Sequence, residues 1–294
     1  MLGGGGARGA AQVGALLGLF EAGVEPPGRL IGVSVGALNG AVIGAYPSLS
    51  GAEMLRELWL NRLARQVFRI HPLGLVLSRL RGNGLAAMPA SNVRRLIERA
   101  IQLTGVDRFE RLKVPLEVLA TDIGAGHAHV FQSGPLLPAL QASTAIPGVF
   151  PTVHIDGASY LDGGIVDNLP VSLAVEEGCR DVLGIDLMAG AELEHPPATW
   201  AELMARTLQL SMHQRMLSDF ERVRRRARVV ILCPLLGPAD GLNMEPRRVE
   251  RLIERARQAT LRLLREHGRR LFRESAVYYL PLSDAPAMLG VVPR

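Results

Sequence analysis

A serine between two glycines is the first group in this sequence whose type and setting could do chemistry. Ser34 lies in Gly32-Val33-Ser34-Val35-Gly36, between a predicted strand, Arg29–Val33, and a predicted helix, Val35–Tyr46. A sharp strand-to-helix turn requires flanking glycines, because side chains there would collide with neighbouring backbone. Such a turn would hold the hydroxyl at the edge of a sheet and at a helix N-terminus, whose dipole favours developing negative charge. The pattern indicates a nucleophile elbow.

A run of glycines near the N-terminus could hold an anion. Gly3-Gly4-Gly5-Gly6-Ala7-Arg8-Gly9 directly precedes a predicted helix, Gly9–Ala22. Successive glycines let backbone N–H groups face one point, where a phosphate or a tetrahedral oxyanion could bind. The run also matches G-x-G-x-x-G, but a dinucleotide site needs an acidic residue at the end of a second strand about 20 positions later. Glu25 lies near that distance and precedes its strand, so the dinucleotide interpretation is the weaker one.

A serine nucleophile needs a base, and an aspartate is the best candidate. Asp162 is followed by Gly163 and Gly164, which leave its carboxylate unobstructed at the end of a predicted strand. None of the seven histidines stands in a recognisable triad context, and His154 is better explained as a structural residue. An isolated D-G-G is most often only a turn. Asp162 is a candidate base because the Ser34 motif and the glycine run occur in the same sequence.

The predicted elements that must position these groups alternate between strands and helices. Such alternation favours an α/β fold, a three-layer sandwich with a mostly parallel central sheet and helices on both faces. The other predicted strands are Val114–Ile123, Ala128–Gln132, Val153–Ile155, Ser159–Leu161, Val182–Met188 and Val229–Cys233. The other predicted helices are Gly51–Arg69, one capped by Ser91 and ending near Leu103, Leu137–Ala145, Trp200–Val223 and Pro246–Arg273.

Composition excludes several classes of protein. With 294 residues, 48% hydrophobic and 21% charged, the chain is neither fibrous nor disordered, and it can bury a core without disulfide or metal. Cys179 and Cys233 match no metal-ligand spacing and suit a reducing compartment, so we expect a cytoplasmic protein with no metal and no cofactor. The uncharged stretch Leu30–Ala52 is long enough to span a bilayer, but its glycines, Asn39 and Pro47 favour a buried strand, turn and helix.

The positive charge is concentrated in the C-terminal third. The segment Glu221–Arg273 holds 15 arginines and six acids, a net +9, whereas the whole chain carries +5 and the remainder therefore −4. A solvated helix face explains this excess most simply. The alternative is peripheral contact with an anionic membrane through the Arg-rich region, centred on Arg247, Arg251 and Arg255. We expect no nucleic-acid partner, and the sequence says nothing of oligomeric state.

Together the three motifs, in this order, resemble the patatin-like phospholipase family of serine acyl hydrolases. The resemblance covers roughly Gly3–Met188. It is strengthened by the motif Leu119-Ala120-Thr121-Asp122, by the run from Ala142 to Pro151 (ASTAIPGVFP), and by Val166-Asp167-Asn168-Leu169-Pro170. In this family a hydrophobic strand runs into the glycine loop, whereas here only Met1-Leu2 precede Gly3. Because a missing central strand would leave its neighbours unpaired, we expect the sequence to begin a few residues after the natural start.

The resemblance implies a Ser–Asp dyad acting on a lipid ester, of phospholipase A or lysophospholipase type. Ser34 would be the nucleophile, Asp162 the base, and the amides of Gly4, Gly5 and Gly6 the oxyanion hole. Arg8 would fix the loop or neutralise an anionic headgroup. The supporting motif residues are Arg8, Gly9, Gly32, Gly36, Gly163 and Gly164.

Some alternatives stay open from the sequence. A catalytically silent lipid-binding or interaction module would keep the same shape without turnover, and the dinucleotide site is a remote third choice. The apolar segment within 71–89 is either a lid that meets lipid or part of the core. We expect residues 1–190 to form the catalytic core and residues 191–294 an Arg-rich extension of helices and strand packed on the same domain.

Overall fold

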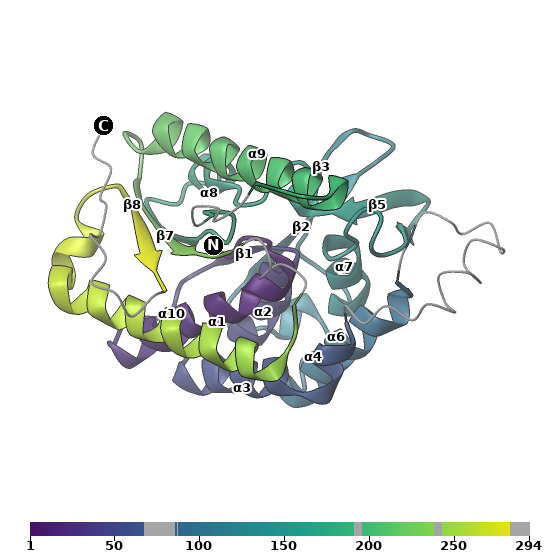
Figure 1. The fold of residues 1–294 in the computed structure, drawn as a ribbon, viewed down its shortest axis with the longest axis horizontal. Helices are drawn as coiled ribbons and strands as arrows, with labels where there is room; N and C mark the ends of the chain where they lie inside the picture. The colour runs from purple at the N-terminus through teal and green to yellow at the C-terminus, as the bar shows by residue number, and fades with distance from the viewer. Residues whose placement is uncertain (68–85, 87, 191–195, 238–242, 283–294) are drawn as a thin grey trace.

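A mixed β-sheet separates two layers of helices (Figure 1). The structure is a computed structural model that describes residues 1–67, 86, 88–190, 196–237 and 243–282. Helices α8 and α9 cover one face of the sheet, and α1, α2, α3, α6 and α10 lie on the other (Figure 1). The predicted three-layer α/β architecture is confirmed. Within the described ranges, no helix has the length and apolar composition that a membrane span needs.

The sheet is parallel through its centre and antiparallel at one end. Strand β1 pairs parallel with β2, and β6, β7 and β8 run parallel to one another, whereas β3, β5 and β4 join by antiparallel pairs. The strands are β1 Leu30–Val33, β2 Leu116–Asp122, β3 His127–Phe131, β4 Val153–Ile155, β5 Ala158–Asp162, β6 Asp181–Ile185, β7 Arg228–Leu235 and β8 Ala276–Pro281.

The first three residues join the two halves of the sheet. Leu2 forms parallel bridges to Gly32 of β1 and to Ile185 of β6. Its amide donates to the Ile31 carbonyl at 2.9 Å, and the Ile185 amide donates to the Met1 carbonyl at 3.0 Å. Leu2 is buried, so these residues act as a short central strand that leads directly into the glycine loop.

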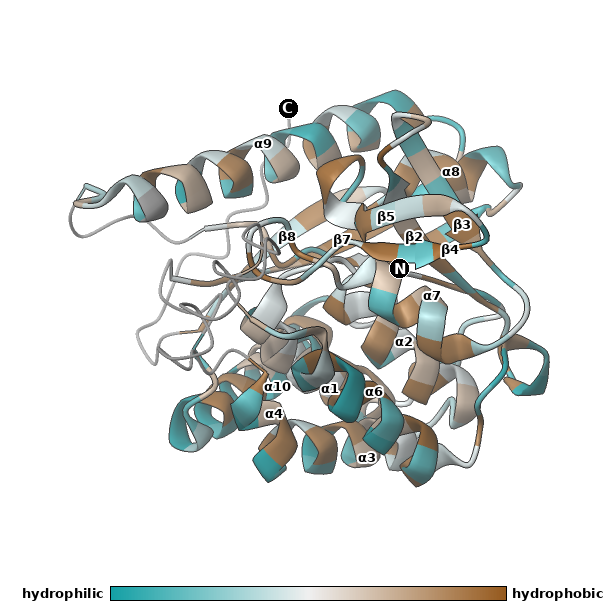
Figure 2. Ribbon diagram, turned by 90° about the vertical axis from the view of Figure 1, so that its right-hand side faces the viewer, coloured by the Kyte–Doolittle hydropathy of each residue, from teal (hydrophilic) through white to brown (hydrophobic). Residues whose placement is uncertain are grey.

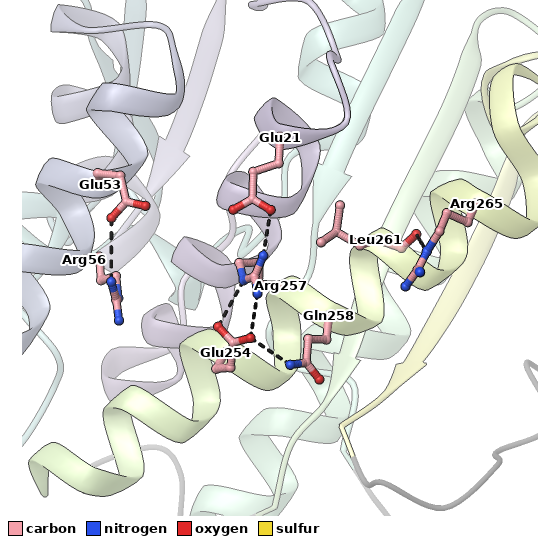
Figure 3. Close-up of polar contacts among 8 residues, drawn as sticks. All are labelled: Glu21, Glu53, Arg56, Glu254, Arg257, Gln258, Leu261 and Arg265. Atoms are coloured by element: carbon pink, nitrogen blue, oxygen red, sulfur yellow. Dashed lines mark hydrogen bonds and ion pairs between the residues drawn. The ribbon is translucent and has the colours of Figure 1, made fainter.

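The helical layer that contains α1 and α10 is the lower layer in Figure 1. In it, α1 (Gly9–Glu21) packs tightly against α10 (Pro246–His267). A Cβ added at Gly14 would overlap the Ile253 carbonyl oxygen, so the absence of a side chain on α1 lets the two backbones meet. At the exposed end of this contact, Arg257 donates to Glu21 and to Glu254 at 2.7 Å each (Figure 3). The layer also contains α2 Val35–Ala45, α3 Leu49–Leu60, α4 Arg62–Gln66, α6 Ala90–Thr104 and α7 Leu136–Ser143.

The upper layer consists of α8 (Val171–Glu176) and the long helix α9 (Trp200–Val223). Thr199 and Glu202 form a capping box at the start of α9, which fixes its first turn. Further along, His213 of α9 lies 2.7 Å from Asp186 Oδ2, after β6, and 3.2 Å from the Tyr279 hydroxyl on β8. Burial raises the pKa of Tyr279 to about 12, so the hydroxyl stays protonated. These buried contacts hold α9 against the sheet.

Several predicted elements differ from the structure in their boundaries. The helix predicted over Gly51–Arg69 is wrong as one element: it breaks at Asn61, whose side chain accepts from the Leu63 amide and caps a separate helix, α4. Ser91 is not the cap of α6, because the helix already begins after Pro89. The last predicted helix ends at His267 and continues as a 3₁₀ turn, Gly268–Phe272.

One strand was not predicted, and one predicted segment lies mostly outside the described residues. Strand β8, Ala276–Pro281, was not predicted, because its parallel pairing with β7 depends on tertiary contacts that no local pattern marks. The predicted lid or core segment 71–89 lies mostly outside the described residues. Its described part includes Met88, which is buried and donates its amide to the Val149 carbonyl at 2.8 Å.

Candidate active site

Ser34 occupies a strained turn between β1 and α2. Its backbone has φ 54° and ψ −124°, a conformation that residues with a side chain rarely adopt. A Cβ added at Gly32 would lie 2.6 Å from Ala37 Cα, and one at Gly36 would overlap the Leu2 carbonyl oxygen. The turn therefore requires glycine on both sides of the serine, as the sequence pattern indicated.

The hydroxyl of Ser34 donates to the carboxylate of Asp162. The distance from Ser34 Oγ to Asp162 Oδ2 is 2.6 Å, and the other carboxylate oxygen accepts from the Gly164 amide at 2.9 Å. Both side chains are buried. The two groups are 128 positions apart in sequence, so only the fold brings them together.

Strand β2 explains how they meet. Val33 of β1 pairs with Leu119, and Asp162 at the end of β5 pairs with Ala120, the next residue of β2. The residue after β1 and the last residue of β5 therefore arrive at one point of the sheet. A Cβ added at Gly163 would overlap the Leu119 carbonyl oxygen, so the chain can leave β5 here only as glycine.

The environment of Asp162 suits a base that works near neutral pH. Burial raises the pKa of Asp162 to about 6, while the hydrogen bonds from Ser34 and from the Gly164 amide act in the opposite direction. Above that pH the carboxylate is ionised and accepts the hydrogen bond from Ser34 Oγ as an anion. A perturbed pKa beside a candidate nucleophile is typical of an active site.

The glycine loop passes directly over the serine. A Cβ at Gly4 would lie 3.1 Å from Ser34 Cβ, and one at Gly5 would lie 2.8 Å from Leu187. Asn168 holds the loop from the other side, because its carbonyl accepts from the Gly4 amide at 3.3 Å and its side-chain Nδ2 donates to the Gly4 carbonyl at 3.2 Å. Gly6 has φ 58° and lines the cavity beside Ser34.

Arg8 and Gly9 connect the loop to its surroundings. The Arg8 guanidinium is buried and donates to Met188 Sδ at 3.7 Å and to Gln209 Oε1, on α9, at 3.4 Å. These contacts tie the loop to α9 and to the segment after β6. Gly9 is packed under Trp59, since a Cβ there would lie 2.5 Å from the indole ring.

Sequence reasoning missed residues that hold the site in place. The Ser34 amide donates to Ser143 Oγ at 2.8 Å, and the Thr121 hydroxyl donates to the Asp162 carbonyl at 2.9 Å. Ser143, Thr121 and Asn168 all lie inside motifs that the sequence marked, but their roles depend on contacts between distant segments. No local pattern could have assigned them.

A small apolar cavity of about 40 Å³ opens beside Ser34. Its lining is almost entirely hydrocarbon. A larger cavity of about 560 Å³ lies at the amino ends of β1 and β6, and neither Ser34 nor Asp162 lines it. The small cavity is lined by Gly6, Ser34, Val35, Leu38, Trp59, Val67, Val93, Leu96, Thr144, Ile146, Phe150 and Met244.

Fold and site together define an α/β protein with a buried serine on a nucleophile elbow and a carboxylate at hydrogen-bonding distance. The family model of the patatin-like phospholipases matches residues 1–175, which contain both of these groups. The chain belongs to the patatin-like phospholipase family.

Known relatives agree with this assignment. An uncharacterised NTE family protein of Mycobacterium bovis is 32% identical over 171 residues, which are 58% of this chain and 43% of that protein. Patatin-like phospholipase domain-containing protein 7 of Rattus norvegicus is 33% identical over 191 residues, 64% of this chain and 13% of the relative. The chain thus spans less than half the length of these relatives.

A solved complex also matches this chain, at low similarity. It is the heterodimeric complex ExoU-SpcU from the type III secretion system of Pseudomonas aeruginosa, with a TM-score of 0.39 and 19% identity. The similarity covers 92% of this chain and 51% of that one.

Proposed function

We propose that the protein is a serine-dependent lipid acyl hydrolase of phospholipase A or lysophospholipase type. The observation that carries the proposal is the 2.6 Å hydrogen bond from Ser34 Oγ to Asp162 Oδ2 beneath the glycine loop. Family membership and the apolar cavity beside Ser34 support a lipid ester as the substrate.

The reaction follows from these positions. Ser34 Oγ attacks the ester carbonyl carbon and passes its proton to Asp162, which delivers it to the leaving alcohol as the ester C–O bond breaks. Water then attacks the acyl-serine, gives its proton to Asp162 and releases the acid, and that proton returns to Ser34 Oγ. The dyad thus ends each cycle in its starting state.

The oxyanion hole belongs to the glycine loop in this proposal. Because the Gly4 amide already donates to the Asn168 carbonyl, the stabilising donors are expected to be mainly the amides of Gly5 and Gly6. Each such donor is worth ~2.7–4 kcal/mol of transition-state stabilisation. Gly4 contributes to the oxyanion hole by allowing the loop to approach Ser34 closely.

A fluorophosphonate probe, which labels activated serines, tests the proposal. We expect covalent labelling at Ser34, located by peptide mass spectrometry and lost in Ser34→Ala. A panel that compares a short-chain nitrophenyl ester with diacyl and lysophospholipids would then define the substrate. Absence of labelling in folded wild-type protein would favour the silent binding module, and thermal stabilisation by NAD would favour the dinucleotide site.

The remaining parts of the chain fit this function as follows. Residues 1–190 carry the chemistry, and residues 191–294 complete the sheet and both helical layers. Peripheral contact with an anionic membrane through the Arg-rich region would bring the enzyme to its substrate. The exposed residues Arg247, Arg251 and Arg255 of α10 are the groups that would make this contact.

A further inference from the structure

The first three turns of α9 expose an unusual number of large apolar side chains. Trp200 is 77% exposed, and it is followed by four others on the same helix. Elsewhere in the described part of the chain, exposed large hydrophobic residues occur only at Leu49, Ile123 and Ile165. We call the five residues of α9 the α9 stripe: Trp200, Leu203, Met204, Leu208 and Leu210.

The stripe lies on one side of the helix. At about 100° per residue, its members fall within about 80° of Trp200. The opposite side carries the buried residues Gln209, His213, Met216 and Phe220, which pack against the sheet and α8. Further along α9 the solvent-facing side becomes polar, with Arg215, Ser218, Glu221 and Arg222. In Figure 2, hydrophobic and hydrophilic segments alternate along the ribbon of α9, as expected of an amphipathic helix.

The outer face of α9 changes from apolar to polar along its length, so contact with water does not account for the apolar side chains of the stripe. If α9 met only water, its outer face would be polar over its whole length. The apolar half is instead confined to residues 200–210. Large apolar side chains exposed together on one face of a helix are typical of an interaction surface.

The stripe lies at the same edge of the sheet as the dyad. Helix α9 leads from the carboxyl end of β6 to the amino end of β7, so its first turns lie at the carboxyl edge, where Ser34 follows β1. The contact from Arg8 to Gln209 shows the proximity directly, because the same turns of α9 touch the glycine loop. Ile165, also exposed, is three residues from Asp162.

Charge at this edge complements an anionic surface. Helix α10 leads from β7 to β8, so its first turns lie at the carboxyl edge too, on the other face of the sheet (Figure 1). The exposed residues Arg247 and Arg251 belong to those turns. The first turns of both helices therefore lie at this edge, where α9 carries exposed apolar side chains and α10 carries exposed cations. Indole and leucine side chains on one face of a helix are typical of helices that lie in a membrane interface.

We propose that the α9 stripe docks the protein on the surface of an anionic lipid bilayer, with the carboxyl edge and its dyad facing the lipid. This rests on the proposed function, because a lipid ester must reach Ser34 from an aggregate. A protein partner on the same rim would cover the approach to the site, whereas a bilayer delivers substrate to it.

Binding to vesicles tests the stripe without any turnover. The Ser34→Ala protein is mixed with vesicles of equal parts phosphatidylcholine and phosphatidylglycerol. Of the two tryptophans, Trp59 is buried and Trp200 is exposed, so a shift of emission to shorter wavelength reports Trp200 entering lipid. Brominated acyl chains should quench that emission. An unchanged Trp200 spectrum on saturating vesicles would overturn the proposal.

A double substitution tests the energetics. Leu203→Gln with Leu208→Gln should weaken vesicle binding at least about tenfold, since burying one leucine is worth about 1.5–3 kcal/mol. Leu49→Gln, an exposed leucine on α3, should leave binding unchanged. Melting temperatures within a degree or so of each other verify that the variants remain folded. Equal binding by the double variant and its parent would contradict the proposal.

Charge reversal tests orientation. Arg247→Glu with Arg251→Glu should weaken binding to the anionic vesicles, and added salt should have the same effect. Arg225→Glu with Arg226→Glu changes the charge equally at the amino edge and should leave binding unchanged. The reverse ranking would overturn the docking orientation.

Two further outcomes distinguish lipid docking from self-association and from failure of the proposed function. If sedimentation shows a dimer that the double leucine variant converts to monomer, the stripe binds a second copy of the chain and the proposal is wrong. If wild-type protein hydrolyses no ester while vesicle binding still depends on the stripe, docking stands and the proposed function fails.

Discussion

At the scale of single residues, the site depends on a carboxylate held where water is scarce. Asp162 has a pKa of about 6, against an ordinary value of 3.8, because it is buried. The folded protein therefore keeps this proton to a higher pH than the unfolded chain does. As the pH rises from about 4 to about 6, ionisation of Asp162 costs folding stability. Above pH 6 the ionised carboxylate is available as the base of the proposed reaction.

Asp162→Asn separates these two effects. Activity should fall by about 10²–10⁴, because the proton acceptor is lost. Stability at pH 8 should rise, by up to on the order of 3 kcal/mol, since the amide has no charge to bury. Wild-type activity should increase with pH through about 6. Thermal melting at pH 8 and a pH–rate profile measure both, and a lower melting temperature for the variant would contradict the account.

A buried hydrogen bond also supports the backbone amide of Ser34. Ser143 Oγ accepts the Ser34 N–H, and Ser143→Ala leaves that buried donor without its acceptor, at a cost of about 1–3 kcal/mol. Because the turn at Ser34 is strained, we also expect fluorophosphonate labelling to slow about tenfold. Ser218→Ala on the exposed face of α9 is the matched control. Unchanged labelling with lowered stability would make Ser143 a purely structural residue.

At the scale of elements, the close approach of α1 and α10 is a specific requirement. Gly14→Ala would place a methyl group on the Ile253 carbonyl, so the helices must separate. We expect a loss of about 3 kcal/mol in the free energy of unfolding, near the upper end for overpacking. Gly28→Ala, in open space, is the control. Urea denaturation measures both, and equal midpoints would show that the contact adapts.

Motifs that depend on local sterics were predicted from the sequence, whereas features that depend on contacts between distant segments were not. The glycine loop, the elbow and D-G-G were found because each requires glycine for local steric reasons. The strands on either side of Asp156-Gly157 were predicted, and they form the antiparallel pair β4–β5 around that turn. The break at Asn61 and the strand β8 were missed, because cap geometry and parallel pairing with β7 depend on tertiary context. The roles of Ser143 and Asn168 were missed for the same reason.

At the scale of the whole molecule, some of the arginines gather at two opposite edges of the sheet. Arg247 and Arg251 lie at the carboxyl edge, whereas a second group surrounds a surface cavity of about 490 Å³ at the amino edge. The sequence showed the excess but not this division, because only the crossover connections place each segment. The second group is Arg180, Arg224, Arg225, Arg226, Arg228 and Arg273.

The whole sheet is expected to unfold as one unit. Leu2 bridges β1 and β6, and α1 from the first part of the chain packs against α10 from the last part. Separation of residues 191–294 from residues 1–190 would break the pairing of β6 with β7 and the packing of α1 against α10, so the cost is shared by the two parts. Native-state hydrogen exchange should show amides of β2 and β7 losing protection at the same urea concentration. Loss of protection in β7 well before β2 would mean that the extension is a separate folding unit. In that case Leu2→Ala, which weakens the bridge between β1 and β6, should increase the difference between the urea concentrations at which β2 and β7 lose protection.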